Sequence, residues 1–173
     1  MRRPDLSLQD LYAALDARRQ ALGLTWAQVT REMNGPPEQV KGHALSPSTV
    51  TGTRVRSVAE ADGVLQMLRW LNRSPESFLP GFSASANTEA GFPNVGQHQV
   101  LRFNTRQIYE ALDARRKERN LTWTQVGKEL GLSASSLTHL AKGGRTSFPS
   151  VMRITGWLGC PAAEFTHAVG GAH

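Results

Sequence analysis

The chain has 173 residues, carries a formal charge of +6 and has an isoelectric point near 10.2. This length suffices for two small domains with buried cores, and the excess of positive charge favours a polyanionic partner. No stretch approaches the roughly 18 apolar residues of a membrane span, and the amino terminus lacks the pattern of a secretory signal. A lone cysteine, Cys160, excludes an intrachain disulfide, and we expect a cytoplasmic protein.

Two long segments of the sequence repeat one another. Residues 11–32 align with residues 108–129, and the alignment pairs Tyr12 with Tyr109 and the run ALDARR with an identical run. Chance does not produce so many identities at one offset, so we interpret the chain as an internal duplication.

The repeat continues beyond Glu32 at a shorter offset. The later part of the first copy, which ends near Phe78, aligns with the later part of the second copy, which ends near Phe165. The offset shrinks by ten residues, so the first copy carries an extra segment at about residues 35–44.

The first copy departs from a regular pattern at its centre. Thr25 and Gln28 have the form of a capping box, which predicts the start of a second helix. The extra segment follows that helix, inside the turn that leads to the third. The third helix is predicted to contain Gly52, and a glycine inside a helix costs about 1 kcal/mol relative to alanine.

The composition changes after the first copy. Residues 81–99 are rich in Gly, Ser, Ala and Asn and show little apolar periodicity, which is typical of a flexible linker. We therefore predict a first domain at residues 1–80, this linker, and a second domain at residues 100–173.

The second copy shows its elements more clearly. Five short helices are predicted, at about residues 105–119, 122–131, 133–141, 149–159 and around Phe165. Thr105 and Ser133 are the expected caps of the first and third, and Asn120 is the expected left-handed stop of the first. A tight turn that contains a glycine separates the second helix from the third, which is typical of a helix-turn-helix. Because neither copy shows strand-like alternation, the predicted fold is all-α, with two five-helix domains joined by a flexible linker.

The apolar positions of these helices predict a matching core in each copy. In the first copy it comprises Leu15, Val29, Met33, Leu45, Val50, Val64, Leu65, Met67, Leu68, Leu71 and Phe78. In the second copy it comprises Leu112, Val126, Leu130, Leu132, Leu137, Leu140, Phe148, Val151, Met152, Ile154, Leu158 and Phe165.

The stretch from Leu121 to Phe165 resembles a known family. It contains TWTQVGKELGLSASSLTHLAKGGR, a helix that ends in WLG, and a late phenylalanine, and it is similar to the lambda-repressor-like (Cro-repressor, or XRE) helix-turn-helix regulators. The resemblance covers nearly all of the second copy and, more loosely, the first. It implies a second helix that lies across the DNA backbone and a third, recognition helix in the major groove.

The resemblance implies a set of DNA-binding residues in each copy. In the second copy these are Trp123, Gln125, Ser133, Ala134, Ser135, Ser136, Thr138 and His139. Lys142 and Arg145 flank the Gly-Gly loop after the third helix, and they are either phosphate contacts or part of a solvated loop. In the first copy they are Trp26, Gln28, Ser46, Ser48, Thr49, Thr51, Arg54 and Arg56, with Pro47 and Gly52 also on the base-facing side. Most of these side chains are short, so part of the specificity is expected to come from DNA shape.

Several of these positions have two interpretations. The tryptophans either donate an indole N–H to a phosphate or pack between helices, and the two glutamines are capping residues before they are phosphate contacts. Arg2, Arg3 and Arg102 precede the first helices and are candidate arms around the DNA. The repeated Asp-Arg pairs of the first helices, around Asp16 and Asp113, are interpreted as surface ion pairs.

Other classes of function lack their residue patterns. The five histidines never stand at metal-ligand spacing with acids or with the cysteine, so no metal is expected. The chain shows no nucleophile-base arrangement, no phosphate-loop glycines and no paired carboxylates. We expect a protein that is not an enzyme and needs no cofactor.

The leading hypothesis is a sequence-specific regulator of transcription, a repressor, that binds double-stranded DNA. Its two modules would form a pseudo-dimer with one half-site each, because a flexible linker of 19 residues spans about 24 Å on average and half-sites lie about 34 Å apart. The alternative keeps DNA binding in the second copy and makes the first a protein-interaction module, as in an antitoxin or a phage adaptor. A homodimer is a further option.

The charge of the two copies bears on this choice. Lys and Arg outnumber Asp and Glu by 10 to 8 in residues 1–80, and by 10 to 5 in residues 100–173. The second copy is therefore predicted to bind DNA more strongly.

Overall fold

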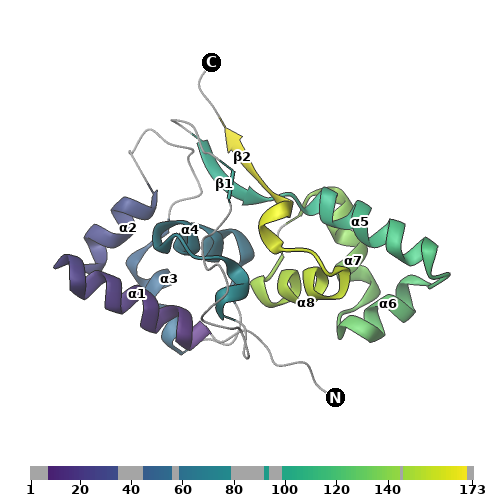
Figure 1. Ribbon diagram of the computed structural model, residues 1–173, viewed down its shortest axis with the longest axis horizontal. Coiled ribbons are helices and arrows are strands. Elements are labelled where there is room, and N and C mark those ends of the chain that lie inside the picture. Colours follow the sequence, from purple (N-terminus) through teal and green to yellow (C-terminus); the bar gives the residue numbers. More distant parts are fainter. Residues whose placement is uncertain are drawn as a thin grey trace.

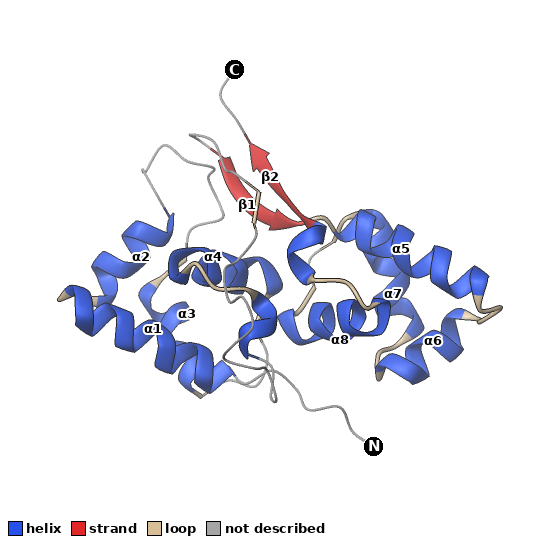
Figure 2. Ribbon diagram, in the orientation of Figure 1, coloured by secondary structure: helices blue, strands red, loops and turns tan. Residues whose placement is uncertain are grey.

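The computed structural model describes residues 8–34, 45–55, 59–78, 92–93, 99–144 and 146–170. We refer to residues 8–78 as the N-terminal half and to residues 99–170 as the C-terminal half. Both halves are mostly helical, and they lie next to each other with a short strand pair beside them (Figures 1 and 2).

The same order of helices occurs in the two halves. The N-terminal half contains α1 (Leu8–Leu22), α2 (Trp26–Asn34), α3 (Pro47–Thr51), η1 (Gly52–Arg54), α4 (Ala61–Leu71) and η2 (Pro75–Phe78), where η denotes a 3-10 helix. The C-terminal half contains β1 (Gln99–Phe103), α5 (Thr105–Glu118), α6 (Trp123–Leu130), α7 (Ala134–His139), η3 (Leu140–Lys142), α8 (Phe148–Leu158), η4 (Ala162–Phe165) and β2 (Thr166–Gly170). The expected fifth helix of each half is thus a single 3-10 turn.

The expectation of an all-α chain is wrong at one place, because β1 and β2 form an antiparallel pair. Its register runs from Gln99 opposite Gly170 to Phe103 opposite Thr166. Leu101 and Phe103 are buried, as is the side chain of the residue between them. A strand that is covered on both faces shows no alternation of polar and apolar residues, so the sequence carries no strand signal here.

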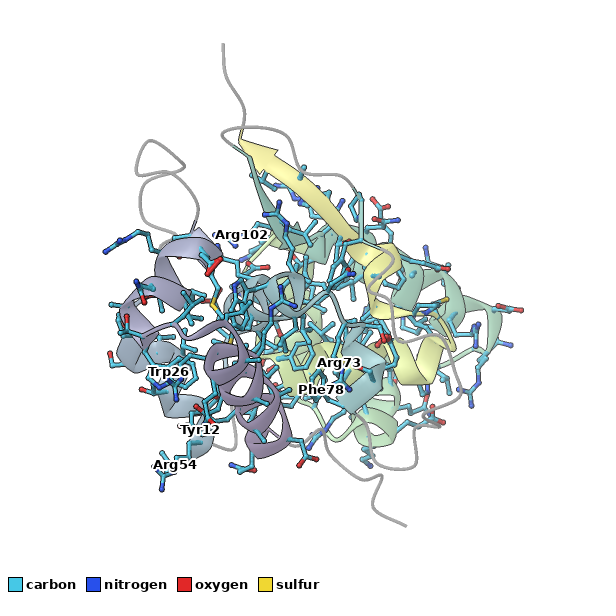
Figure 3. The ribbon with its side chains drawn as sticks, turned by 60° about the vertical axis from the view of Figure 1, so that its left-hand side comes forward. Tyr12, Trp26, Arg54, Arg73, Phe78 and Arg102 are labelled. Carbon is cyan, nitrogen blue, oxygen red and sulfur yellow. The ribbon has the colours of Figure 1, made fainter. Side chains whose placement is uncertain are left out.

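Arg102 lies in β1 and is not an arm. Only 6% of the residue is exposed, and its guanidinium donates a hydrogen bond to the carbonyl of Leu101. Figure 3 labels it at the strand pair. The other two candidate arm residues, Arg2 and Arg3, lie outside the described residues.

Side-chain caps define where the helices start. For two helices the observed position differs by one residue from the predicted one. Asn104, and not Thr105, caps α5, because the Asn104 side chain accepts a hydrogen bond from the N–H of Gln107. Ser147 caps α8, so this helix begins before Pro149. The predicted left-handed stop at Asn120 is confirmed by its φ of 56°.

Nearly all predicted core residues are buried. The two exceptions are Leu45 and Leu132, which are half-buried and pack against the core from the turn between the second and third helices. The amphipathic pattern therefore identified the core, because the residues that face inward recur at helical spacing.

The two halves are joined by direct contacts. Helix α4 packs against α8, and β1 packs along α4. The N–H of Ala61 donates to the carbonyl of Thr146 at 2.9 Å, and the N–H of Phe148 donates to the carbonyl of Ala59 at 2.8 Å. These contacts join the halves directly. Of residues 81–99, the predicted linker, only Phe92, Pro93 and Gln99 are among the described residues.

Candidate nucleic-acid interface

The turn between α6 and α7 is short and built from local hydrogen bonds. At the start of α6, Gln125 N–H donates to Thr122 Oγ1 at 3.1 Å, and Thr122 N–H donates to Gln125 Oε1 at 2.8 Å, so the predicted capping box is present. Gly131 ends α6 with a φ of 73°, a conformation that favours glycine. Ser133 then caps α7 by accepting the N–H of Ser136. Gln125 is therefore confirmed as a capping residue.

Gly127 lets the turn fold back on its own helix. A Cβ atom at this position would overlap the carbonyl oxygen of Leu132, which belongs to the turn. A side chain larger than hydrogen would push the turn outward and displace α7 with it. The glycine inside α6 thus has a packing role that outweighs its cost to the helix.

Helix α7 is anchored on one side and open on the other. Leu137 is fully buried, and Leu140 of η3 continues the anchor. Ser135, Ser136, Thr138 and His139 are exposed, and Ala134 is half-buried. Side chains three and four residues apart share one face of a helix, so the predicted base-facing residues lie together on the open side. Two of the serines also serve the cap, since Ser133 Oγ lies 2.7 Å from Ser136 Oγ.

Trp123 is held between two side chains of α5. Its ring stacks on Tyr109 with centroids 5.2 Å apart, and the guanidinium of Arg116 lies 4.9 Å from the ring centroid. Arg116 is itself tied to Asp113 at 2.6 Å and to the carbonyl of Leu121. The packing interpretation of Trp123 is confirmed; its contact with a phosphate stays a prediction.

The ion pairs of the C-terminal half gather on α5. The hydrogen bond from Arg116 lowers the pKa of Asp113 below its ordinary value, and Lys117 at 3.1 Å adds to this effect. Arg119 pairs with Glu129, which also accepts the indole N–H of Trp157. The charges predicted to be structural are therefore neutralised by neighbours, as expected of surface pairs.

The open side of α7 lies in a segment without acidic residues. The sequence contains no Asp or Glu between Glu129 and Glu164, which includes all of α7 and η3. Lys142 is exposed at the end of η3, and Arg106 of α5 lies against Gly143, where its Nε is 3.2 Å from the place of a Cβ. Among the described residues, Lys142 and Arg106 have no acidic partner. This arrangement leaves positive charge beside α7, where phosphates are attracted.

Arg106 was missed by the sequence reasoning. Its position in the first turn of α5 gives no sign that it reaches a loop almost 40 residues later, and only the tertiary structure brings it there. Arg145, which the sequence predicts for the same loop, lies outside the described residues.

The N-terminal half has the same contacts around its second helix. Trp26 stacks on Tyr12 with centroids 5.6 Å apart, as Figure 3 shows, and Arg19 lies 5.0 Å from the indole centroid. Gln28 and Thr25 form the reciprocal hydrogen bonds of a capping box, at 3.2 and 2.8 Å. Gln28 is thus a confirmed capping residue, and Trp26 a packed one.

Helix α3 also has an anchored and an open side. Val50 is buried, Ser48 and Thr49 are exposed, and Thr51 is half-buried. Ser46 caps the helix by accepting the N–H of Thr49. Arg54 is exposed and points away from the body of the molecule in Figure 3; Arg56 lies outside the described residues.

Two details of this region differ from the prediction. Gly52 is not inside α3 but at its C-cap, with a helical φ of −61°, so its cost to the helix is small. The turn before α3 is closed by a residue that the sequence reasoning did not single out, Asn34. Its side chain accepts the N–H of Leu45 at 2.7 Å and donates to the carbonyl of Leu45 at 2.8 Å. The predicted extra segment, residues 35–44, lies between them and outside the described residues.

Other classes of site find little support in the described part of the chain. It contains no group of three or more His, Cys, Asp or Glu side chains placed to hold a metal ion. None of its helices is long and apolar enough to cross a membrane.

Comparison with known proteins assigns the C-terminal half. The family model HTH_3, described as helix-turn-helix, matches residues 112–165, from the middle of α5 to the end of η4. Residues 112–165 are a helix-turn-helix domain. This domain implies DNA binding, and the match does not extend into the N-terminal half. No curated protein and no solved structure matches the chain.

Proposed function

We propose that this protein regulates transcription by binding duplex DNA, with α7 of its helix-turn-helix domain in the major groove. The observation that carries the proposal is the open side of α7, which is polar, anchored in the core by Leu137 and free of acidic residues on either side. A short helix with these properties fits the groove, where phosphates repel carboxylates and base edges accept hydrogen bonds from polar groups.

The proposal gives the residues of α7 and its loop distinct tasks. Ser135, Thr138 and His139 would meet base edges, where hydroxyl groups serve as donors or acceptors to any base. Lys142 and Arg106 would contact phosphates, which position the domain but carry no sequence information. Because the domain places few long polar side chains at the groove, its affinity for DNA is expected to depend strongly on the phosphate contacts.

The test is a titration of the full chain on duplex DNA selected from a random pool. Wild-type binding should weaken steeply with salt, and Lys142→Ala should reduce the slope of log K against log salt by about 1. His139→Ala should weaken the selected site more than random DNA. Lys117→Ala removes one charge from the outer face of α5 and serves as the control, which should leave site preference unchanged. Absent or salt-independent binding would contradict the proposal.

The N-terminal half has two candidate functions. The contacts of three residues in the N-terminal half, Trp26, Gln28 and Val50, resemble those of Trp123, Gln125 and Leu137 in the C-terminal half. This likeness supports a second DNA-binding module, so that the chain forms a pseudo-dimer. The restriction of the family match to residues 112–165 favours the alternative, a module that binds a protein partner.

A variant of the full chain separates these candidates. Thr51→Glu places a negative charge on the open side of α3, where it would repel DNA phosphates but leave the fold intact. The second-module candidate predicts a shorter footprint on DNA and weaker binding. An unchanged footprint supports the protein-interaction candidate. Thr138→Glu on α7 is the matched variant, and it should abolish binding under either candidate.

A further inference from the structure

The two halves meet through a contact that is nearly symmetric. The repeat alignment, at its offset of 87, pairs Ala59 with Thr146 and Ala61 with Phe148. The two hydrogen bonds across the interface, Ala61 N–H to Thr146 O and Phe148 N–H to Ala59 O, are therefore exchanged when the halves are exchanged. Between them, Glu60 and Ser147 face each other in an antiparallel bridge. Such a self-complementary contact is the mark of a twofold axis.

The arrangement of the helices follows the same axis. In Figure 1, a half-turn in the plane of the picture carries α1 and α2 onto the places of α5 and α6, and α4 onto that of α8. A rotation about the viewing direction leaves depth unchanged. It follows that α3 and α7 lie on the same side of the molecule, so that one face of a duplex can meet both.

The interface leaves the halves little freedom to move. The N–H of Phe103 donates to Asp62 Oδ1 at 2.8 Å, and the N–H of Ala162 donates to Glu76 Oε1 at 2.6 Å. Both bonds run from the backbone of the C-terminal half to a carboxylate of the N-terminal half. Together with the packing of α4 against α8 and β1, they set the separation of α3 and α7.

The two open sides are not alike in chemistry. The alignment pairs His139 of α7 with Gly52, and Lys142 with Val55, which is 80% exposed. Arg106, beside the loop after α7, is paired with a glutamine, Gln9. Of these, the pair His139 and Gly52 lies at a base-facing position, so the two halves present different donors and acceptors to the bases there. The differences at Lys142 and Arg106 change the contacts with phosphates.

We infer that one chain recognises one non-palindromic duplex site, made of two unlike half-sites on the same face of the DNA at a single fixed spacing. This inference rests on the proposed DNA binding and on the participation of both halves. It differs from the behaviour of a flexible tandem pair, which tolerates many spacings, and from that of a homodimer, which selects a palindrome.

The experiment begins with selection of bound duplexes by the full chain, followed by a spacing series on the selected site. One to five base pairs are inserted at the centre of the site, each of which turns one half-site by roughly 34° relative to the other. We expect a non-palindromic site, a complex of one chain per duplex, and a loss of affinity of about tenfold from the first inserted pair. Affinity should not recover within the series.

A double variant tests the role of the interface. Asp62→Ala with Glu76→Ala removes both carboxylates that join the halves, whereas Glu110→Ala with Glu118→Ala removes the same charge from exposed positions on α5. In the interface variant, the loss of affinity caused by an inserted base pair should be at least threefold smaller than in the control variant. Should the interface variant unfold, the spacing series of the wild-type protein still decides the question.

Three results would overturn the inference. A selected palindrome bound by two chains, a footprint confined to one half-site, or an affinity that ignores spacing would each contradict a fixed asymmetric site, although DNA binding itself would stand. Absence of any DNA binding would instead refute the proposed function on which the inference rests.

Discussion

The two halves solve the same turn in different ways. In the C-terminal half α6 ends at Leu130 and α7 begins at Ala134, and this short connection requires Gly127, where any side chain meets the turn. In the N-terminal half the aligned residue is Thr30, which is buried and whose hydroxyl donates to the carbonyls of Trp26 and Ala27. A turn as tight as that of the C-terminal half does not fit over a threonine.

The longer connection of the N-terminal half is compatible with this side chain. Twelve residues separate α2 from α3, against three between α6 and α7, and the Asn34 side chain closes the longer turn by binding both backbone groups of Leu45. A helix can thus keep its place in a domain although its connection changes. A short turn with a glycine and a long turn with a side-chain clamp are two ways to position the helix that follows.

The largest change in stability is expected when Gly127 of the C-terminal half is replaced by the threonine that the N-terminal half carries at the aligned position. Gly127→Thr should destabilise the protein by about 2 to 3 kcal/mol, because the new side chain overpacks the turn at Leu132. Urea denaturation measures this change, and DNA binding should fall with it because α7 is displaced. The reverse change, Thr30→Gly, should cost less, about 1 kcal/mol, because glycine is a poorer helix former and a small buried side chain is lost. Equal effects of the two variants would contradict the comparison.

The next effect concerns the clamp. Asn34→Ala should lower the free energy of unfolding by about 1 to 2 kcal/mol, because two backbone groups of a half-buried residue lose their partner. Asn34→Asp keeps the acceptor for the N–H of Leu45 and should lose less at high pH than the alanine variant. If the alanine variant is as stable as the wild type in denaturant titrations, the clamp does not close the turn.

A smaller effect is expected from charge at the loop after the third helix. Val55→Lys gives the N-terminal half the cation that Lys142 provides in the C-terminal half, and Val55 is exposed, so stability should not change. If both halves meet DNA, the slope of log K against log salt should steepen by about 1. Val55→Gln is the uncharged control. An unchanged slope would mean that this loop does not reach a phosphate.

The smallest effect is expected at Asp113 of α5, in the dependence of stability on pH. Asp113 has a lowered pKa because Arg116 and Lys117 stabilise its charged form. Its contribution to stability is therefore present above the unfolded pKa of about 3.9 and is lost as the pH falls through the lower folded value. Asp113→Asn should remove that part of the acid dependence, at most about 1 kcal/mol for a surface pair. Thermal melts between pH 2 and 7 would show parallel curves for variant and wild type if the pair contributes nothing.

Much of the fold was predictable because it depends on neighbours along the chain. Capping boxes at Thr25 and Thr122, the serine cap of α7, and the left-handed stop at Asn120 each involve residues at most four apart, and all are present. The same short range explains why the core and the open side of α7 were identified. The use of that side for DNA stays a prediction, and so does the internal duplication.

Local patterns in the sequence specify the helices, most of their caps, their inward faces and the acid-free segment around α7. Other features appear only in the folded chain: β1 and β2 pair, Arg102 is buried, Arg106 reaches the loop after α7, and Asp62 and Glu76 join the halves. The difference follows from separation along the chain. Periodicity and caps report interactions within one or two helical turns, whereas these contacts connect residues from about 40 to 90 positions apart.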